Sequence, residues 1–182
     1  MQVPPGDMVF SDMRFRDFGA DNCDCYRIED SNLYRKSLRH LGYKSVEFVV
    51  YNSSGRAGES MLIFVEAKTT LRPQNSKSRF SDEIADISQK FMDSLQIICG
   101  IWHGGRKGKT QLPANFAQFY ESGKKIVFAL VVKNSEKREL LTVADAIYRK
   151  LLKERRLWKF DVKVLNEELS QKENLVLAED SI

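Results

Sequence analysis

The sequence predicts an α/β fold: a single domain with a central mixed β-sheet flanked by helices. A chain of 182 residues accommodates one core of ordinary size. Its apolar and charged contents, 42% and 30%, lie near globular averages and exclude disordered and fibrous classes. Strand-like and helix-like segments also alternate along the chain, which is typical of a sheet covered by helices on both faces.

The first part of the chain predicts a helix and a β-hairpin after an irregular start. Residues 1–25 contain scattered prolines and glycines without sustained periodicity. Apolar residues recur at helical spacing over 28–41, and Gly42 follows the last of them. The segments 44–51 and 61–70 are rich in β-branched and aromatic residues and flank a polar stretch with two glycines, so they indicate a hairpin.

The second part predicts two helices and two strands. Apolar residues at every third or fourth position predict a long amphipathic helix over 81–101. The near-continuous apolar run 125–133 is typical of a strand buried on both faces. An apolar stripe predicts a helix over 140–156, and 160–165 closes the chain as a last strand. The expected order is therefore α-β-β-α-β-α-β.

These elements define an expected domain of residues 26–165, between the lead-in 1–25 and an acidic C-terminal tail of residues 166–182. The first ten residues lack the basic region followed by an apolar region that is typical of a signal peptide, and no stretch approaches the roughly 18 apolar residues of a membrane span. Three cysteines, an odd number, favour reduced thiols. We therefore expect a cytoplasmic protein with no membrane partner, and leave open whether it forms a homodimer.

The net charge of +4 is distributed unevenly. Residues 100–163 hold 15 Lys and Arg against 6 Asp and Glu, whereas the remainder holds 14 against 19. A polyanion such as DNA would be drawn to the basic region, and the acidic remainder could hold a cation. Solvated helix surfaces give the same pattern, so charge alone does not decide between these interpretations.

Three charged residues of the predicted hairpin indicate a site. Glu66 and Lys68 share a strand face with Phe64, where charged groups cost free energy unless they are paired or bind a ligand. Glu47 is expected in the middle of the first strand, where pairing across the hairpin would bring it near Glu66. Two neighbouring carboxylates suit Mg²⁺, and Lys68 could orient water or stabilise charge on phosphorus. A cross-strand ion pair is the simpler structural alternative.

An acid in the first hairpin strand, Glu66-Ala67-Lys68 in the second, and a following amphipathic helix resemble the PD-(D/E)xK nuclease superfamily. The closer similarity is to a poorly characterised bacterial group within it. The resemblance implies a restriction-endonuclease-like core and hydrolysis of phosphodiester bonds, here expected in DNA, with Mg²⁺ or Mn²⁺. Glu47 and Glu66 would be metal ligands and Lys68 the catalytic lysine. The chain lacks a Pro-Asp pair, and Glu59 stays open as the second acid.

Further residues are weaker candidates. The resemblance suggests Glu29 as an additional acid on the first helix, although negative charge at a helix start is stabilising in itself. Gln89 and Lys90, on the helix after the second hairpin strand, are accessory candidates. The basic residues of a glycine-rich loop either contact a nucleic-acid backbone or form a solvated turn. They are Arg106, Lys107 and Lys109.

Two functions follow from these observations. The first is a Mg²⁺-dependent deoxyribonuclease. The second is a catalytically inactive module with the nuclease fold, which binds nucleic acid or a protein partner through its basic region.

Overall fold

A five-stranded mixed sheet organises the molecule, in the order β3-β4-β5-β6-β7. The computed structural model describes residues 8–18, 23–52, 60–71, 77–104, 112–116 and 125–177. Neighbouring strands pair antiparallel from β3 to β5 and parallel from β5 to β7. The strands are β3 (Cys23–Tyr26), β4 (Phe48–Asn52), β5 (Met61–Lys68), β6 (Lys125–Val132) and β7 (Asp161–Asn166).

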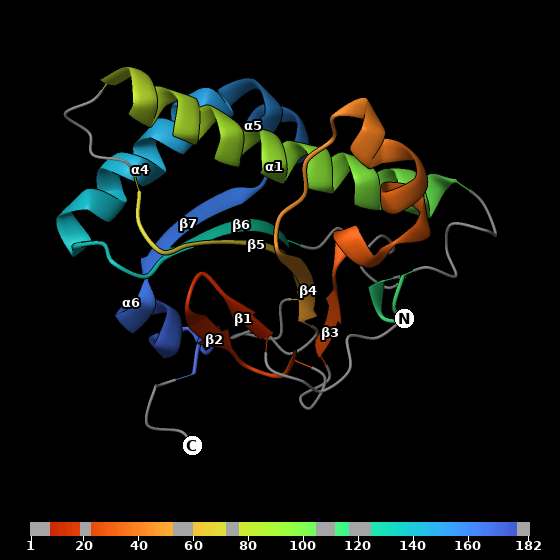
Figure 1. Ribbon diagram of the computed structural model, residues 1–182, viewed down its shortest axis with the longest axis horizontal. Helices are drawn as coiled ribbons and strands as arrows, with labels where there is room; N and C mark the ends of the chain where they lie inside the picture. The colour runs from red at the N-terminus through yellow and green to blue at the C-terminus, as the bar shows by residue number, and fades with distance from the viewer. Residues whose placement is uncertain are drawn as a thin grey trace.

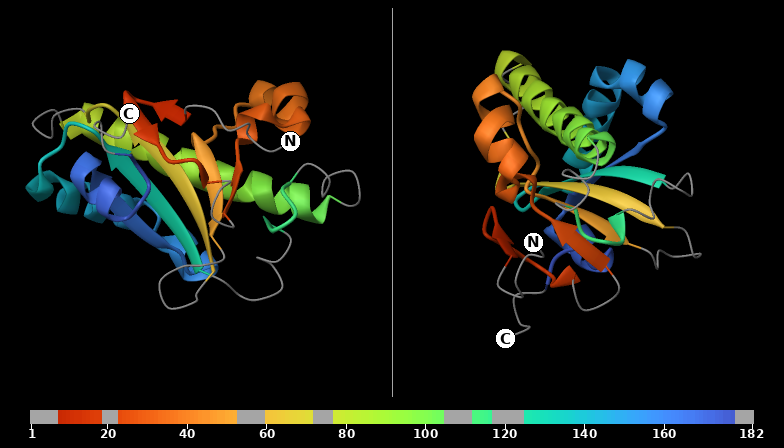
Figure 2. Two further views of the ribbon diagram at one scale, coloured as in Figure 1. Left: turned by 90° about the horizontal axis from the view of Figure 1, so that it is seen from below. Right: turned by 90° about the vertical axis from the view of Figure 1, so that its right-hand side faces the viewer.

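Helices cover one face of this sheet, and a hairpin with a short helix covers the other (Figures 1 and 2). The first layer holds α1 (Lys77–His103), α4 (Lys137–Lys150) and α5 (Leu152–Trp158). The second holds β1 (Met8–Phe10), β2 (Met13–Phe15) and α6 (Glu167–Lys172). Beside α1 lie three short helical segments: η2 (Ile28–Asp30), η3 (Tyr34–Leu38) and η4 (Arg39–Leu41).

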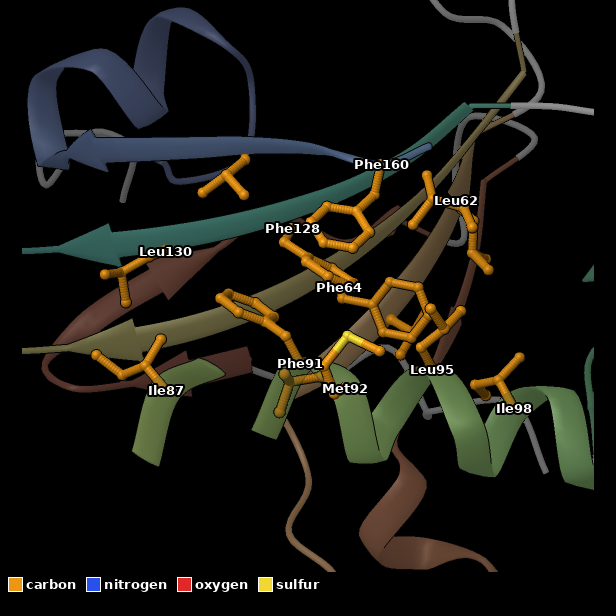
Figure 3. Close-up of a cluster of buried hydrophobic side chains, with 14 of the residues drawn as sticks. Leu62, Phe64, Ile87, Phe91, Met92, Leu95, Ile98, Phe128, Leu130 and Phe160 are labelled. Atoms are coloured by element: carbon orange, nitrogen blue, oxygen red, sulfur yellow. The ribbon is translucent and has the colours of Figure 1, made fainter. Parts of the chain in front are cut away.

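The core between α1 and the sheet is aromatic (Figure 3). Phe91 of α1 stacks on Phe128 of β6 at 4.8 Å between ring centroids, and Phe128 contacts Phe160 at 4.3 Å. Phe64 of β5 meets Phe128 edge-on at 5.5 Å. All four rings are buried, so the sheet face that carries Phe64 is closed to water by α1. The prediction of one α/β domain with a mixed sheet flanked by helices is confirmed.

The expectation of an irregular lead-in over residues 1–25 is wrong for its described part, because β1 and β2 lie within it and β3 begins there. Strands of three or four residues are too short to display a period, yet Met13 and Phe15 are buried beneath the sheet. The acidic tail is likewise not a separate segment. It contains α6, and Val176 is buried and bridges to Phe15. Both ends of the described chain therefore belong to the domain.

Two predicted helices differ from those observed. The helix expected over 28–41 is divided into η2, η3 and η4, of which η3 is π-helical and the others are 3₁₀ segments. The helix expected over 140–156 is broken between α4 and α5 at the buried Leu151, whose φ and ψ of −102° and 20° leave the helical range. Among the described residues, no helix is long and apolar enough to cross a membrane.

Candidate carboxylate and lysine site

Glu66 is the centre of the candidate site. It follows Leu62 and Phe64 along β5 at intervals of two residues, so its side chain points to the face that α1 covers. The residue is fully buried, with 0% of its surface exposed. A carboxylate at the end of an apolar row is costly unless cations or ligands compensate it.

Two lysines face one oxygen of Glu66. Lys90 of α1 donates from Nζ to Oε1 at 2.7 Å, and the Lys68 ammonium lies 3.8 Å from the same oxygen. The other oxygen, Oε2, is buried and has no hydrogen-bond partner in the part of the chain that the structure describes. An unsatisfied buried acceptor costs free energy, which a ligand at Oε2 would recover.

Burial raises the pKa of Glu66 to about 7, against the opposing charge and hydrogen bond of Lys90. The neighbouring Glu47 carboxylate adds to the rise. Burial lowers the pKa of Lys90, but the carboxylates of Glu66, Glu47 and Asp86 together outweigh burial and raise the pKa above its ordinary value. Glu66 therefore gains and loses a proton near neutral pH while Lys90 stays charged.

Glu47 lies in a bend immediately before β4, which corrects the expectation that it occupies the middle of a strand. Phe48 is opposite Val65 in the β4–β5 register, so Glu47 is one position further towards Glu66. The two carboxylates interact electrostatically. Burial raises the pKa of Glu47 above its ordinary value, against the charge of Lys90.

The late start of β4 has a specific cause. The backbone N–H of Lys44 donates to Asp93 Oδ2 at 2.9 Å, and that of Val46 donates to Ser94 Oγ at 2.9 Å. Asp93 and Ser94, which we call the docking pair, belong to α1 and are buried. Because these two amides bond to helix side chains rather than to a strand, the segment before Phe48 follows α1 and brings Glu47 to the site.

The remaining predicted residues are placed differently. Ser45 Oγ donates to Glu29 Oε1 at 3.2 Å. Burial is the main cause of the raised pKa of Glu47, and the Glu29 carboxylate adds to it. Glu29 therefore joins Glu47 and Glu66 in a cluster of interacting carboxylates. Gln89 donates to Asp93 Oδ1 at 2.5 Å, which supports the docking pair. Four predicted residues lie outside the described part of the chain. They are Glu59, Arg106, Lys107 and Lys109.

Sequence reasoning did not single out the docking pair. A signal was available for Ser94, which stands four residues after Lys90 in α1. Both residues lie among Phe91 and Leu95, where a purely structural helix would carry apolar side chains. Polar residues at such positions must find partners. In this protein the partners are Glu66 and the segment that precedes β4.

The donor set is suited to one kind of metal. Within the described ranges, no three His, Cys, Asp or Glu side chains form a ready metal site. Glu47 and the unpartnered Oε2 of Glu66 offer two carboxylates. Mg²⁺ is commonly bound by one or two carboxylates, with water and substrate phosphate completing its shell. Glu47 and Glu66 therefore fit Mg²⁺ in number and type, and do not fit a structural zinc site.

Comparison with known proteins gave no match. The chain matches no protein-family model, no curated protein and no solved structure. The proposed function therefore rests on the chemistry of Glu47, Glu66, Lys68 and Lys90, together with the sequence resemblance described above.

Proposed function

We propose that the protein is a metal-dependent nuclease that hydrolyses phosphodiester bonds, with DNA as substrate and Mg²⁺ or Mn²⁺ as cofactor. The observation that carries the proposal is Glu66. Glu66 is fully buried, and its Oε2 atom has no hydrogen-bond partner in the described chain. Three charged side chains interact with it electrostatically, namely Glu47, Lys68 and Lys90. Two carboxylates beside two ammonium groups would suit a cation together with a phosphate.

The proposal also draws on the resemblance to the PD-(D/E)xK superfamily. The resemblance implies a restriction-endonuclease-like core, and a mixed sheet flanked by helices supports this part of the proposal. In that superfamily arrangement the acid and lysine of E-x-K stand on the second hairpin strand, as Glu66 and Lys68 do on β5. A cytoplasmic location belongs to the same proposal, as does a basic region that holds DNA.

Each residue would have a distinct role. Glu47 and Glu66 Oε2 would hold the cation, which on binding supplies Lewis-acid stabilisation and lowers the pKa of water. Lys68, with 28% of its side chain exposed, can reach a substrate phosphate and stabilise negative charge on its oxygens. Lys90 fixes the orientation of Glu66 through Oε1 and leaves Oε2 available.

The proposal is tested with supercoiled plasmid and single-stranded DNA in Mg²⁺ or Mn²⁺. We expect nicking by the wild type, and a loss of roughly a hundredfold or more in Glu66→Gln and Lys68→Ala, the size associated with losing one electrostatic group at a reacting centre. Lys172→Ala is the charge control, because Lys172 is exposed on α6 and pairs with Glu168. Thermal melts verify folding. Equal rates in all four proteins would remove the nuclease assignment.

The second candidate is a catalytically inactive module. One observation favours it: Lys90 already neutralises Glu66, as in a structural ion pair. An inactive module would bind DNA with a steep salt dependence and without a requirement for Mg²⁺. Calorimetric titration with Mn²⁺ separates the two, since the nuclease binds Mn²⁺ through Glu66 and loses that binding in Glu66→Gln, whereas the module gives no heat in either protein.

A further inference from the structure

A surface pocket opens beside the candidate site. Its volume is about 320 Å³, and it is formed by η2, η3 and η4 next to α1. We call it the η3 pocket. Its lining consists of Glu29, Asp30, Tyr34, Arg35 and Arg39. Glu29 also interacts electrostatically with Glu47, which links the pocket to the candidate site.

One cation of the η3 pocket is fixed in place. Arg35 donates from Nε to the carbonyl oxygen of Glu29 at 3.0 Å and from Nη2 to Asp30 Oδ1 at 2.9 Å. Asp30 also lies 3.6 Å from Arg27, so two guanidinium groups offset its charge. Arg35 still has further N–H groups, because a guanidinium carries five. It is a pre-oriented donor at the pocket wall.

The second cation is available for a ligand. Arg39 is exposed, and no hydrogen bond or ion pair joins its guanidinium to any residue that the structure describes. It stands four residues after Arg35, at the junction of η3 and η4. The guanidinium is planar, permanently charged and matched to phosphate oxygens, so two of them at one pocket favour a phosphate group.

The surrounding segment is basic although it lies in the acidic part of the sequence. Residues 27–44 hold five Lys and Arg against two Asp and Glu. The π-helical turn of η3 is a rare conformation that is frequently found at functional sites. A phosphate bound at Arg35 and Arg39 would therefore lie on a basic segment of the chain, beside the carboxylates of Glu29 and Asp30 in the pocket lining.

We propose that the η3 pocket binds a backbone phosphate of the nucleic acid, one neighbouring the phosphate at Glu66, through Arg35 and Arg39. This inference rests on the proposed function, because the substrate class is the same. The volume of the η3 pocket exceeds that of a phosphate, which leaves room for the attached sugar. This volume is at the lower end of the range for ligand pockets. The pocket would set the register of the strand, while Glu66 and Lys68 lie at the reacting phosphate.

The test is fluorescence anisotropy of a labelled duplex in EDTA across a salt series, with Arg39→Ala, Arg39→Lys and Lys172→Ala. Removing one phosphate contact should weaken binding about tenfold near 0.1 M salt and reduce the slope of log K against log salt by about 0.9. Arg39→Lys keeps the charge and should retain the wild-type slope. Lys172→Ala, on the opposite face of the sheet, should match the wild type (Figure 1).

The outcomes separate this inference from the nuclease assignment. Weaker binding and a shallower slope in Arg39→Ala support the η3 pocket even where the wild type cleaves no DNA. Unchanged affinity and slope in Arg39→Ala overturn the pocket, even where Glu66→Gln abolishes cleavage. For an active protein, a rise in KM without a change in kcat is the matching kinetic result for Arg39→Ala.

Discussion

At the scale of single residues, Glu66 has an environment that few carboxylates have. It continues the row of Leu62 and Phe64 on β5 and is fully buried on the sheet face that α1 covers. Lys90 satisfies Oε1 only, and burial is the largest influence on the proton affinity of the group. A carboxyl group whose surroundings raise its pKa to about 7 can exchange its proton for a cation at physiological pH.

The raised pKa of Glu66 predicts how stability changes with pH. The folded pKa of about 7 exceeds the value of 4.5 for an unfolded chain, so the folded state binds more protons between these limits. The stabilisation from Glu66 is therefore fully present below pH 4.5 and is lost as pH rises to about 7. The free energy of unfolding should fall by at most about 1.4 kcal/mol per pH unit from this group.

Urea unfolding of the wild type and Glu66→Gln between pH 4 and 8 measures this effect, because the titration of other groups largely cancels in the difference. We expect the wild type to lose stability relative to the variant as pH rises through this window. A difference that stays constant with pH would show that Glu66 titrates normally.

At the scale of elements, α1 serves the core and the site with different side chains. Phe91 and Leu95 close the aromatic core (Figure 3). Lys90 and the docking pair of Asp93 and Ser94 contact polar groups instead. Side chains of α1 thereby hold both β5 and the segment that precedes β4. The positions of Glu47 and Glu66 depend on the same helix.

The docking pair gives a prediction at this scale. Asp93→Ala leaves the N–H of Lys44 without its acceptor and should lower the free energy of unfolding by about 1–3 kcal/mol. It should also increase the hydrogen-exchange rate of the Lys44 amide. Asp93→Asn keeps an acceptor oxygen and should restore much of the amide protection.

Asp82→Ala is the matched control, because Asp82 is exposed on the same helix and its loss should change stability by less than about 0.5 kcal/mol. The prediction is contradicted where the Lys44 amide exchanges equally fast in Asp93→Ala and in the wild type. That outcome would leave the strand start without the cause given above.

At the scale of the whole molecule, the sheet is buried on both faces by segments far apart in the sequence. Arg16 N donates to Leu175 O at 3.1 Å, and Leu177 N donates to Arg14 O at 2.8 Å, so the ends of the described chain pair with each other. Leu175 and Val176 join the cluster that contains Phe15 and Phe48. The second layer is therefore assembled from both termini of the described chain.

This arrangement predicts that the C-terminal segment stabilises the domain. Leu175→Ala removes a side chain that is 7% exposed and should cost about 2–4 kcal/mol in chemical denaturation. Leu141→Ala, the control, alters a side chain that is 77% exposed on α4 and should cost less than about 0.5 kcal/mol. Equal stabilities of the two variants would indicate a tail that is independent of the fold.

The sequence by itself determined the larger elements. Periodicity over β5, α1 and α4 is long enough to reveal which face is apolar, and two-residue alternation placed Glu66 and Lys68 on one face of β5. The continuous apolar run of β6 identified a strand buried on both faces. Local spacing carries that information without any knowledge of neighbours. The mixed sheet flanked by helices follows from the order of these elements.

Only the tertiary structure decided the rest of the site. The bend at Glu47 depends on Asp93 and Ser94, almost fifty residues away from the segment that they hold. The pairing of Lys90 with Glu66 and the η3 pocket also arise from contacts between separate elements. Such contacts leave no period in the sequence, because they depend on which buried polar groups must find partners once the chain is packed.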